Sequence, residues 1–333
     1  MTSHDVASLA GVSRSAVSRT FTPDASVSEK TRRKVLAAAQ KLGYQPNVIA
    51  RSLITRQSRL IGLIMGEWEN PFYTTMLRGF TERLGERDYR VMLLASRTAG
   101  DVEAAMRMLM QYRVDGMVLV SASPPAAAAA DYARGGGRLV LVNREADGVP
   151  ATSIVSDAAR DGREIGRRLI AGGYARIALA RGDATLPSGV LRTEALREAI
   201  AASGRARIVI DRSGTLGYAA GRAFGNEVMA LPEPPDAIVC STDMTAIGVL
   251  DAVRIDRALQ VPRQVGVVGF GDIPASGWAS HDLTTIRLPL ERMIDAAVAT
   301  VIDEGRPATG PRRIVVEGEV VVRSTLRDAP SRG

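Results

Sequence analysis

The hydrophobic residues of this 333-residue chain follow two patterns, one before and one after residue 60. Up to residue 43, small apolar residues recur three or four positions apart between polar ones, which is typical of short amphipathic helices. After residue 60, compact apolar runs alternate with amphipathic stretches of ten or more residues. The two patterns predict a small helical unit followed by a larger α/β unit.

The first predicted helix begins at Thr2, which stands three residues before Asp5, the spacing of a capping box. Its inward-facing residues recur at helical spacing and are Val6, Leu9 and Ala10. Gly11 comes next, and glycine adopts the positive φ of a tight turn most readily. The pattern therefore predicts a short helix that ends in a turn.

A second helix is predicted to start at Ser13, whose hydroxyl can cap it. Its residues divide into an inward pair, Ala16 and Val17, and an outward polar set, Arg14, Ser15, Ser18 and Arg19. Two short helices joined by a turn that contains glycine form a helix-turn-helix. Because the outward side chains include short serines, the second helix can enter the major groove of DNA.

A third helix is predicted over 29–42, capped by Ser28 and ended by Gly43. Its apolar stripe consists of Val35, Ala38, Ala39 and Leu42.

Positive charge is concentrated in this first part of the chain. Residues 1–59 contain 10 Lys and Arg against 3 Asp and Glu, an excess of +7, which equals the formal net charge of the whole chain. The remaining residues are balanced. Such an asymmetry predicts that a polyanion-binding head precedes a neutral body, although a solvated basic tail has the same charge.

The body contains two sets of short apolar runs that read as buried parallel strands. The first set is LIGLIM, YRVMLLA, GMVLV and RLVLV, and the second is RIALA, RIVI, AIVC and VGVVGF. Amphipathic segments separate the runs, so each set predicts a doubly wound parallel sheet with helices on both faces. The C-terminal segment is expected to cross back and add a helix and strands.

In open α/β sheets, ligands bind beyond the carboxyl ends of the strands. Residues directly after the predicted strands are therefore candidates for a pocket. They are 70–73, Ser121, Ser123, Asn143, Arg144, 181–183, Thr242, Asp243, Gly271 and Asp272.

The order of several segments resembles the LacI/GalR family of bacterial transcriptional regulators. These segments are DVASLAGVSRSAVSR, then VSEKTRRKVLAAAQKLGYQPNVIARSL, then IGLI, NPFY and, near the end, DLTTIRLP. The resemblance implies an α/β protein with a two-lobed periplasmic-binding-protein-like core of two doubly wound parallel sheets, behind a small all-α helix-turn-helix domain.

The implied boundaries are a DNA-binding domain at 1–46, a hinge helix or linker at 47–57 and an effector-binding and dimerisation domain at 58–333. The N-lobe would span about 58–156 and 287–316, and the C-lobe about 157–286 and 317–328.

The resemblance also implies roles in DNA binding. Arg14, Ser15 and Arg19 would read base edges, and the guanidinium of an arginine can grip guanine O6 and N7. Ser13, Ser18 and Asn47 would bind phosphates and Arg51 would add a phosphate contact. The hinge segment 47–55 is too short to be a stable helix alone. Leu53 would be the wedge that kinks the minor groove, unless it packs against the body instead.

For the pocket, the resemblance implies that Phe72 and Tyr73 stack on the effector and that Arg192 grips its oxygens. Asn143 stands where a carboxylate is common. Three further predicted pocket residues come from the strand ends: Ser121, Arg144 and Asp272. Thr242 and Asp243 match a usual Asn-Asp pair.

Two departures from the family favour an effector with an acidic group. Gly271 replaces an aspartate that clamps sugar hydroxyls, and Arg212 stands where an aromatic residue is common. Both changes make the pocket more positive. The alternative is that Arg212 points to solvent while Asp272 takes over the clamp.

Other classes of protein fit less well. The two histidines, His4 and His281, lie in the head and in a polar loop, and Cys240 ends an apolar run, so an α/β enzyme is disfavoured. No metal-ligand spacing or cofactor motif is present, so neither is expected. An exported solute-binding protein would need a signal peptide and would lack the basic head.

We therefore predict a cytoplasmic, DNA-binding transcriptional regulator without a membrane segment, and we expect it to act as a repressor. Its partners would be a pseudo-palindromic operator in double-stranded DNA, a small-molecule effector such as a sugar or sugar acid, and a second copy of the chain. No heptad repeat follows Arg323, which favours a homodimer over a tetramer.

Overall fold

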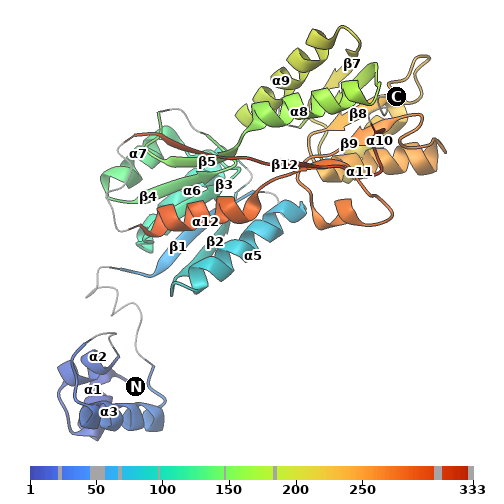
Figure 1. Ribbon diagram of the computed structural model, residues 1–333. Coiled ribbons are helices and arrows are strands. Elements are labelled where there is room, and N and C mark those ends of the chain that lie inside the picture. Colours follow the sequence, from blue (N-terminus) through green and yellow to red (C-terminus); the bar gives the residue numbers. More distant parts are fainter. Residues whose placement is uncertain are drawn as a thin grey trace. The chain divides into compact units, whose positions relative to one another are not determined.

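The computed structural model describes residues 1–21, 25–45, 57–66, 70–96, 98–145, 148–182, 186–303 and 310–328. The chain forms two compact units, Met1–Arg59 and Leu60–Gly333 (Figure 1). The predicted hinge helix, with Asn47, Arg51 and Leu53, lies outside the described residues.

The first unit consists of three helices whose ends follow local signals. They are α1 (Ser3–Ala10), α2 (Arg14–Thr20) and α3 (Glu29–Leu42). The capping box is formed: the Thr2 N–H donates to Asp5 Oδ2 over 2.8 Å, and the Asp5 N–H donates to Thr2 Oγ1 over 3.4 Å. These bonds hold the pKa of the Asp5 carboxyl below its usual value. Gly11 and Gly43 end α1 and α3 with φ of 63° and 60°, as predicted.

The three helices share one small core. It consists of Val6, Ala7, Ala10, Val17, Val35, Ala38 and Ala39, with Leu42 packed at its edge. The prediction for Leu9 was wrong, because this side chain is 46% exposed and Ala7 occupies the inward position. Close packing of α1 against α3 selects the small side chain at the crossing, while the larger one projects outward.

The second unit contains a six-stranded parallel sheet, in the order β11-β5-β4-β3-β1-β2. Its strands are β1 (Leu60–Met65), β2 (Arg90–Ala95), β3 (Gly116–Val120), β4 (Arg138–Val142), β5 (Thr152–Ser156) and β11 (Arg312–Val316). The inner strands β1, β3, β4 and β5 are buried because helices cover both faces, as expected for parallel strands, whereas the edge strands β2 and β11 are partly exposed.

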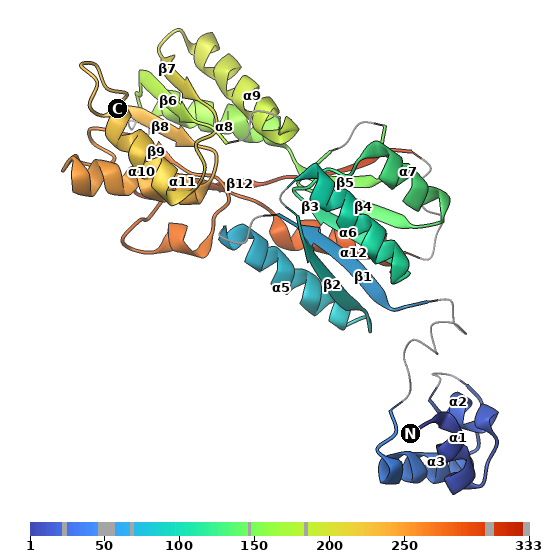
Figure 2. The same ribbon diagram turned by 180° about the vertical axis from the view of Figure 1, so that it is seen from behind.

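Alternate residues of these strands enter two different hydrophobic clusters. Ile61 and Leu63 join α5 (Pro71–Gly85) and α12 (Leu290–Ile302) on one face. Ile64 joins α6 (Ala99–Gln111) and α7 (Ala126–Arg134) on the other. Figure 1 is seen from the side of α5 and α12, and Figure 2 shows α6 and α7 from behind.

A four-stranded parallel sheet follows, in the order β7-β6-β8-β9. Its strands are β6 (Arg176–Ala180), β7 (Arg207–Arg212), β8 (Ala237–Cys240) and β9 (Gly266–Val268). The helices of this part are α8 (Ala158–Ala171), α9 (Pro187–Ser203), α10 (Gly217–Val228) and α11 (Asp243–Asp251), with short turns η1 (Ala252–Asp256) and η2 (Pro274–Gly277). Helices α8 and α9 pack on one face, and α10 and α11 on the other.

The chain connects the two sheets more than once. After β9, strand β10 (Thr285–Arg287) leads into α12 and β11, which belong to the first sheet. Strand β12 (Glu319–Val321) then returns and pairs antiparallel with β10. The prediction of two parallel sheets with a C-terminal segment that crosses back is confirmed. No helix among the described residues is long and apolar enough to cross a membrane.

Candidate DNA interface and effector pocket

Helix α2 presents a polar face to solvent. Arg14, Ser15, Ser18 and Arg19 are all exposed, while Val17 and Thr20 are 1% and 5% exposed and hold the helix on the core. Arg14 stands in the first turn and Arg19 in the last, so two guanidinium groups project from one seven-residue helix. This is the arrangement that the outward pattern predicted.

Ser13 fixes the start of this helix. Its Oγ accepts a hydrogen bond from the Ala16 N–H over 3.2 Å and lies 2.9 Å from Ser15 Oγ. At the other end, Arg19 Nε donates to the Ser15 carbonyl oxygen over 3.4 Å. Ser13 is thus first a helix cap, and its exposed hydroxyl stands beside that of Ser15.

Arg32 on α3 is a residue that the sequence reasoning missed. Its Nη1 donates to the carbonyl oxygen of Thr20 over 3.2 Å, at the C-terminal end of α2. An arginine at that end satisfies a carbonyl that has no partner within the helix. Arg32 therefore orients the exposed helix. Only its place in the first turn of α3, three residues after Glu29 and outside the apolar stripe, could have indicated this.

The carboxyl ends of β3 and β4 carry two pairs of predicted pocket residues. Asn143 Nδ2 donates to Ser121 Oγ over 3.1 Å, and Arg144 Nε donates to Ser123 Oγ. Ser121 and Asn143 both have a positive φ, 54° and 56°. Residues other than glycine rarely adopt this conformation, and it is concentrated at ligand sites.

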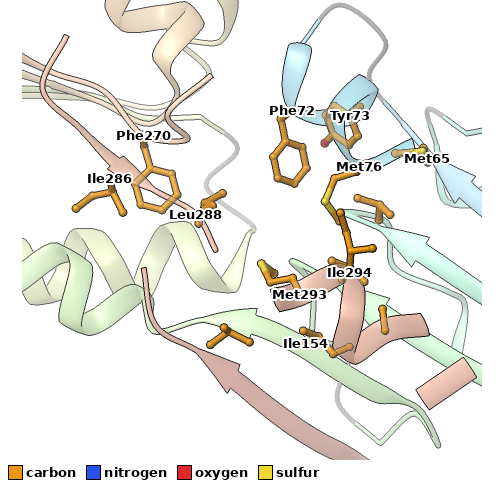
Figure 3. Close-up of a cluster of buried hydrophobic side chains, with 14 of the residues drawn as sticks. Met65, Phe72, Tyr73, Met76, Ile154, Phe270, Ile286, Leu288, Met293 and Ile294 are labelled. Carbon is orange, nitrogen blue, oxygen red and sulfur yellow. The ribbon is translucent and has the colours of Figure 1, made fainter. Parts of the chain in front are cut away.

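Phe72 and Tyr73 lie in the first turn of α5 and are buried. Asn70 caps this helix, since its Oδ1 accepts from the Phe72 N–H over 3.0 Å. The two rings meet edge to face, with centroids 5.0 Å apart, and are 7% and 8% exposed. They belong to one apolar cluster with Met76, Phe270 and others (Figure 3). An effector stacked on either ring would have to reach into this cluster.

Arg192 on α9 is partly buried. Its guanidinium carbon lies 3.2 Å from the centroid of the Phe270 ring, and its Nε is buried. Burial lowers the pKa of Arg192 to about 10, against the opposing effect of the nearby Asp161 carboxyl. At neutral pH the side chain remains a partly buried cation. Arg192 borders a cavity of about 40 Å³ at the ends of β6 and β8.

Thr242 and Asp243 have structural partners. Thr242 caps α11, accepting from the Thr245 N–H over 3.2 Å. The buried Asp243 carboxylate accepts from Thr285 Oγ1 over 2.6 Å and from the Ile273 N–H over 2.8 Å. Burial raises the pKa of this carboxyl. Asp243 thereby ties α11 to β10 and to the loop after β9.

The carboxylate of Asp272 is also engaged. Arg287 Nε donates to its Oδ2 over 2.6 Å, and Arg323 Nη2 donates to its Oδ1 over 2.7 Å. The side chain is 8% exposed, and its φ is 53°. Beside it, Gly271 has a φ of 134°, a value that other residues rarely adopt, so an aspartate there would be strained.

The structure does not bring Arg212 to these residues. At the end of β7, its guanidinium makes two bonds of 2.6 Å to the carboxylate of Glu227 on α10, and the side chain is 45% exposed. A bidentate partner on the neighbouring helix, unseen in the sequence, holds it there. The positive charge near the pocket therefore comes from Arg192 rather than Arg212.

Asp161 on α8 is a second residue that the sequence reasoning missed. It is 2% exposed, and its Oδ2 has no hydrogen-bond partner among the described residues. Burial raises the pKa of this carboxyl from 3.8 to about 6, although the positive charges of Arg192 and Arg160 oppose the shift. An acidic residue within the buried face of an amphipathic helix was the available signal.

Replacing Asp161 by Asn is expected to change how stability depends on pH. Because the folded-state pKa is the higher one, the folded chain binds more protons than the unfolded chain between about pH 4 and 6, and stability falls as pH rises through this window. At pH 7.5 we expect D161N to have a free energy of unfolding about 3 kcal/mol above that of the wild type, and at pH 4 a nearly equal one.

Urea denaturation followed by tryptophan fluorescence measures this difference, since both tryptophans, Trp68 and Trp278, come after residue 60. An equal difference at both pH values would show that the carboxyl does not titrate in this window.

Comparison with known proteins identifies the family to which each part of the chain is similar. Residues 2–47 match the family described as bacterial regulatory proteins, lacI family. Residues 58–312 match the periplasmic binding proteins and sugar binding domain of the LacI family. The two matches follow the division of the chain into its two units.

Relatives cover nearly the whole chain. The ribose operon repressor of Bacillus subtilis is 31% identical over 286 residues, which are 86% of each chain. The ribose operon repressor of Escherichia coli K12 is 31% identical over 309 residues, 90% of this chain and 92% of that one. The regulator CelR of Thermobifida fusca is 30% identical over 337 residues, 96% of each.

Solved structures agree in fold. The lac repressor dimer bound to operator and the anti-inducer ONPF has a TM-score of 0.84 at 24% identity, over 98% of both chains. The CelR–cellobiose complex has a TM-score of 0.69 at 28% identity, over 98% of this chain and 99% of that one. With a helix-turn-helix matching one part of the family and two parallel sheets matching the other, the chain belongs to the LacI family of bacterial DNA-binding transcriptional regulators.

Proposed function

We propose that this regulator is a repressor that binds an operator as a homodimer and is controlled by a small-molecule effector. The observation that carries the DNA-binding part is the exposed face of α2, where Arg14 and Arg19 project from a helix anchored on its unit by Val17 and by Arg32. In such a geometry arginine reads guanine, and the short Ser15 and Ser18 allow close approach.

The hinge roles remain proposals from the sequence. Asn47 and Arg51 would contact phosphates, and Leu53 would insert into the minor groove. A regulator that binds chromosomal DNA acts in the bacterial cytoplasm.

The effector would bind beyond the carboxyl ends of the strands. Two groups of polar side chains gather there, one around Ser121, Asn143 and Arg144 and one around Arg192. Parallel sheets place ligands at this edge. Effector binding would alter the affinity for DNA, and linkage requires DNA to alter the affinity for effector by the same factor.

An exposed apolar patch on the second unit supports self-association. Trp278 is 60% exposed and Ile255 67%. They lie on two segments that are in contact, because Arg254 beside Ile255 donates to the carbonyl oxygens of Ser280 and His281, and the His281 ring stacks on Trp278. Exposed large apolar groups of this kind mark protein interfaces. The lac repressor, which shares the fold, is a dimer.

Selection of duplexes from a random library, followed by titration, tests the proposal. We expect a pseudo-palindromic site bound by two chains per duplex. Affinity should fall about 10³-fold between 50 and 200 mM salt, because six or more phosphates across two heads release counterions. Enrichment of no sequence, or binding of one chain to an asymmetric site, would contradict it.

A further inference from the structure

The cavity beside Arg192 is bordered both by polar groups that can donate hydrogen bonds and by apolar side chains that include Ile165, Leu179, Leu196 and Val239. It lies at the carboxyl ends of β6 and β8, and its polar lining consists of Arg181, Gly182, Gly189, Arg192, Thr193 and Ser241. Its volume of about 40 Å³ is more than the roughly 10–15 Å³ that one water molecule requires by the same measure, so a ligand group larger than water can enter.

Two buried donors in this lining have no acceptor. Neither Arg192 Nε nor Ser241 Oγ has a hydrogen-bond partner among the described residues. A buried donor left without an acceptor is destabilising, and more so when it carries a charge. Both atoms therefore mark a place where a bound group supplies the missing acceptor.

The start of α9 adds a third source of donors. Its N-cap is Leu186, whose side chain contains no acceptor for the N–H groups of the first turn. Gly189 in that turn lines the cavity. The N-terminal end of a 17-residue helix carries partial positive charge and attracts anions.

Carboxylate and amide acceptors, in contrast, are absent from the described lining, whereas the hydroxyls of Thr193 and Ser241 can both donate and accept. None of the described residues that line the cavity is Asp, Glu, Asn or Gln. The Gly189 carbonyl oxygen already accepts from Thr193 Oγ1 over 2.8 Å, and that of Ala180 from the Ser241 N–H over 2.9 Å. A carboxylate only accepts, and unlike a neutral sugar hydroxyl it also supplies a negative charge opposite the Arg192 guanidinium, which forms no ion pair within 4 Å among the described residues.

Nearby carboxylates are engaged elsewhere. Asp211 pairs with Arg181 and Arg197, Asp272 with Arg287 and Arg323, and Asp243 with Thr285 Oγ1 and the Ile273 N–H. Among the described residues, one further acid lies close to Arg192, the buried Asp161, and the two side chains form no ion pair within 4 Å. Asp183, which directly follows the lining residue Gly182 in sequence, lies outside the described residues.

We propose that the effector carries a carboxylate group, which this cavity binds through the Arg192 guanidinium, the Ser241 hydroxyl and the first turn of α9. The inference rests on the proposed control by a small molecule and names its chemical class. The remainder of the effector would extend toward the side chains at the ends of β3 and β4.

The stability of the ligand-free protein gives the first test. Arg192→Met removes a partly buried cation that has no carboxylate partner within 4 Å among the described residues. The methionine keeps a long unbranched side chain that can still pack against Phe270. The matched control is Arg323→Met, which removes a similarly buried arginine that already has a carboxylate, Asp272. The measurement is the Tm at pH 5, where the raised pKa leaves Asp161 neutral in both proteins.

We expect R192M to keep or raise the Tm and R323M to lower it by several degrees. A decrease in Tm for R192M as large as that for R323M would overturn the proposal, because Arg192 would then already have a stabilising partner within the ligand-free protein.

Ligand binding gives the second test. Full-length protein is titrated with matched pairs, D-glucuronate against D-glucose and D-galacturonate against D-galactose, with D-glucose 6-phosphate as the phosphoryl probe. We expect at least one acid to raise the Tm by 2 °C or more and to bind at least 10-fold more tightly than its neutral partner. R192M should abolish the shift, Arg192→Lys should keep part of it, and Ser241→Ala should weaken it.

Equal binding of a neutral partner, a shift that survives in R192M, or a stronger response to the phosphate would overturn the carboxylate assignment. If no compound shifts the Tm, the Tm values of ligand-free R192M and R323M alone decide whether the proposal holds. Selection of an operator by the wild type is measured separately, so failure of the carboxylate assignment is distinguishable from failure of the proposed regulatory function.

Discussion

Replacing both Arg14 and Arg19 by Ala is expected to lower affinity for the selected operator by about 10³-fold, because each bidentate contact of arginine with guanine contributes about 1–3 kcal/mol of discrimination. Both side chains are exposed on α2, and neither is part of the core that holds the unit together. Fluorescence anisotropy with the operator and with a scrambled duplex measures the loss.

The matched control removes the same charge from another face. Lys30 and Lys41 are exposed on α3, and their double replacement by Ala also subtracts two positive charges from the head. We expect this control to lower binding of both duplexes by about 10-fold or less, through phosphate contacts alone. If the two double variants lost operator affinity equally, α2 would contribute charge and no base recognition.

Replacing Gly162 by Ala is expected to lower the free energy of unfolding by about 3 kcal/mol, since overpacking a close contact costs about this much. A Cβ at this position of α8 would lie 2.1 Å from the carbonyl oxygen of Arg192 and 3.1 Å from the backbone nitrogen of Leu196. Both atoms belong to the backbone of α9, so the whole helix must shift. The shift would also move Arg192 and its cavity.

Gly85→Ala is the matched control for this prediction. Gly85 ends α5, and a Cβ there would meet nothing within 4 Å. Because alanine has the higher helix propensity, this variant should gain about 0.5 kcal/mol. Urea midpoints of the two variants and the wild type give the comparison. If Gly162→Ala had the same urea midpoint as the wild type, the backbones of α8 and α9 would not be in contact in solution.

The DNA-binding unit was largely predictable because its signals are local. A cap three residues before its partner, a glycine at a turn and an apolar stripe at helical spacing are each read within one or two turns of chain. Thr2, Ser13, Ser28, Gly11 and Gly43 all have the predicted roles. The sequence did not predict that Ala7 faces the core and Leu9 faces solvent, because the choice between two apolar residues of α1 depends on how closely α3 approaches that helix.

The candidate pocket was predictable only as a set of strand ends. The apolar runs indicate where each strand stops, and parallel pairing brings those ends to one edge. The partners of each side chain there are distant in sequence: Arg212 binds Glu227 15 residues on, and Asp243 binds Thr285 42 residues on. No spacing rule reaches that far.

The sequence by itself determined the two-unit organisation, the class of each unit and the exposed arginines of α2, because hydrophobic periodicity and caps act over a few residues. Only the tertiary structure decided which charges neutralise one another. It engaged Asp272 and Arg212 with partners, buried Asp161, and left Arg192 and Ser241 with unsatisfied donors in one cavity. The physical reason is that burial and ion pairing depend on contacts across sheets and helices, which exist only once the chain has packed.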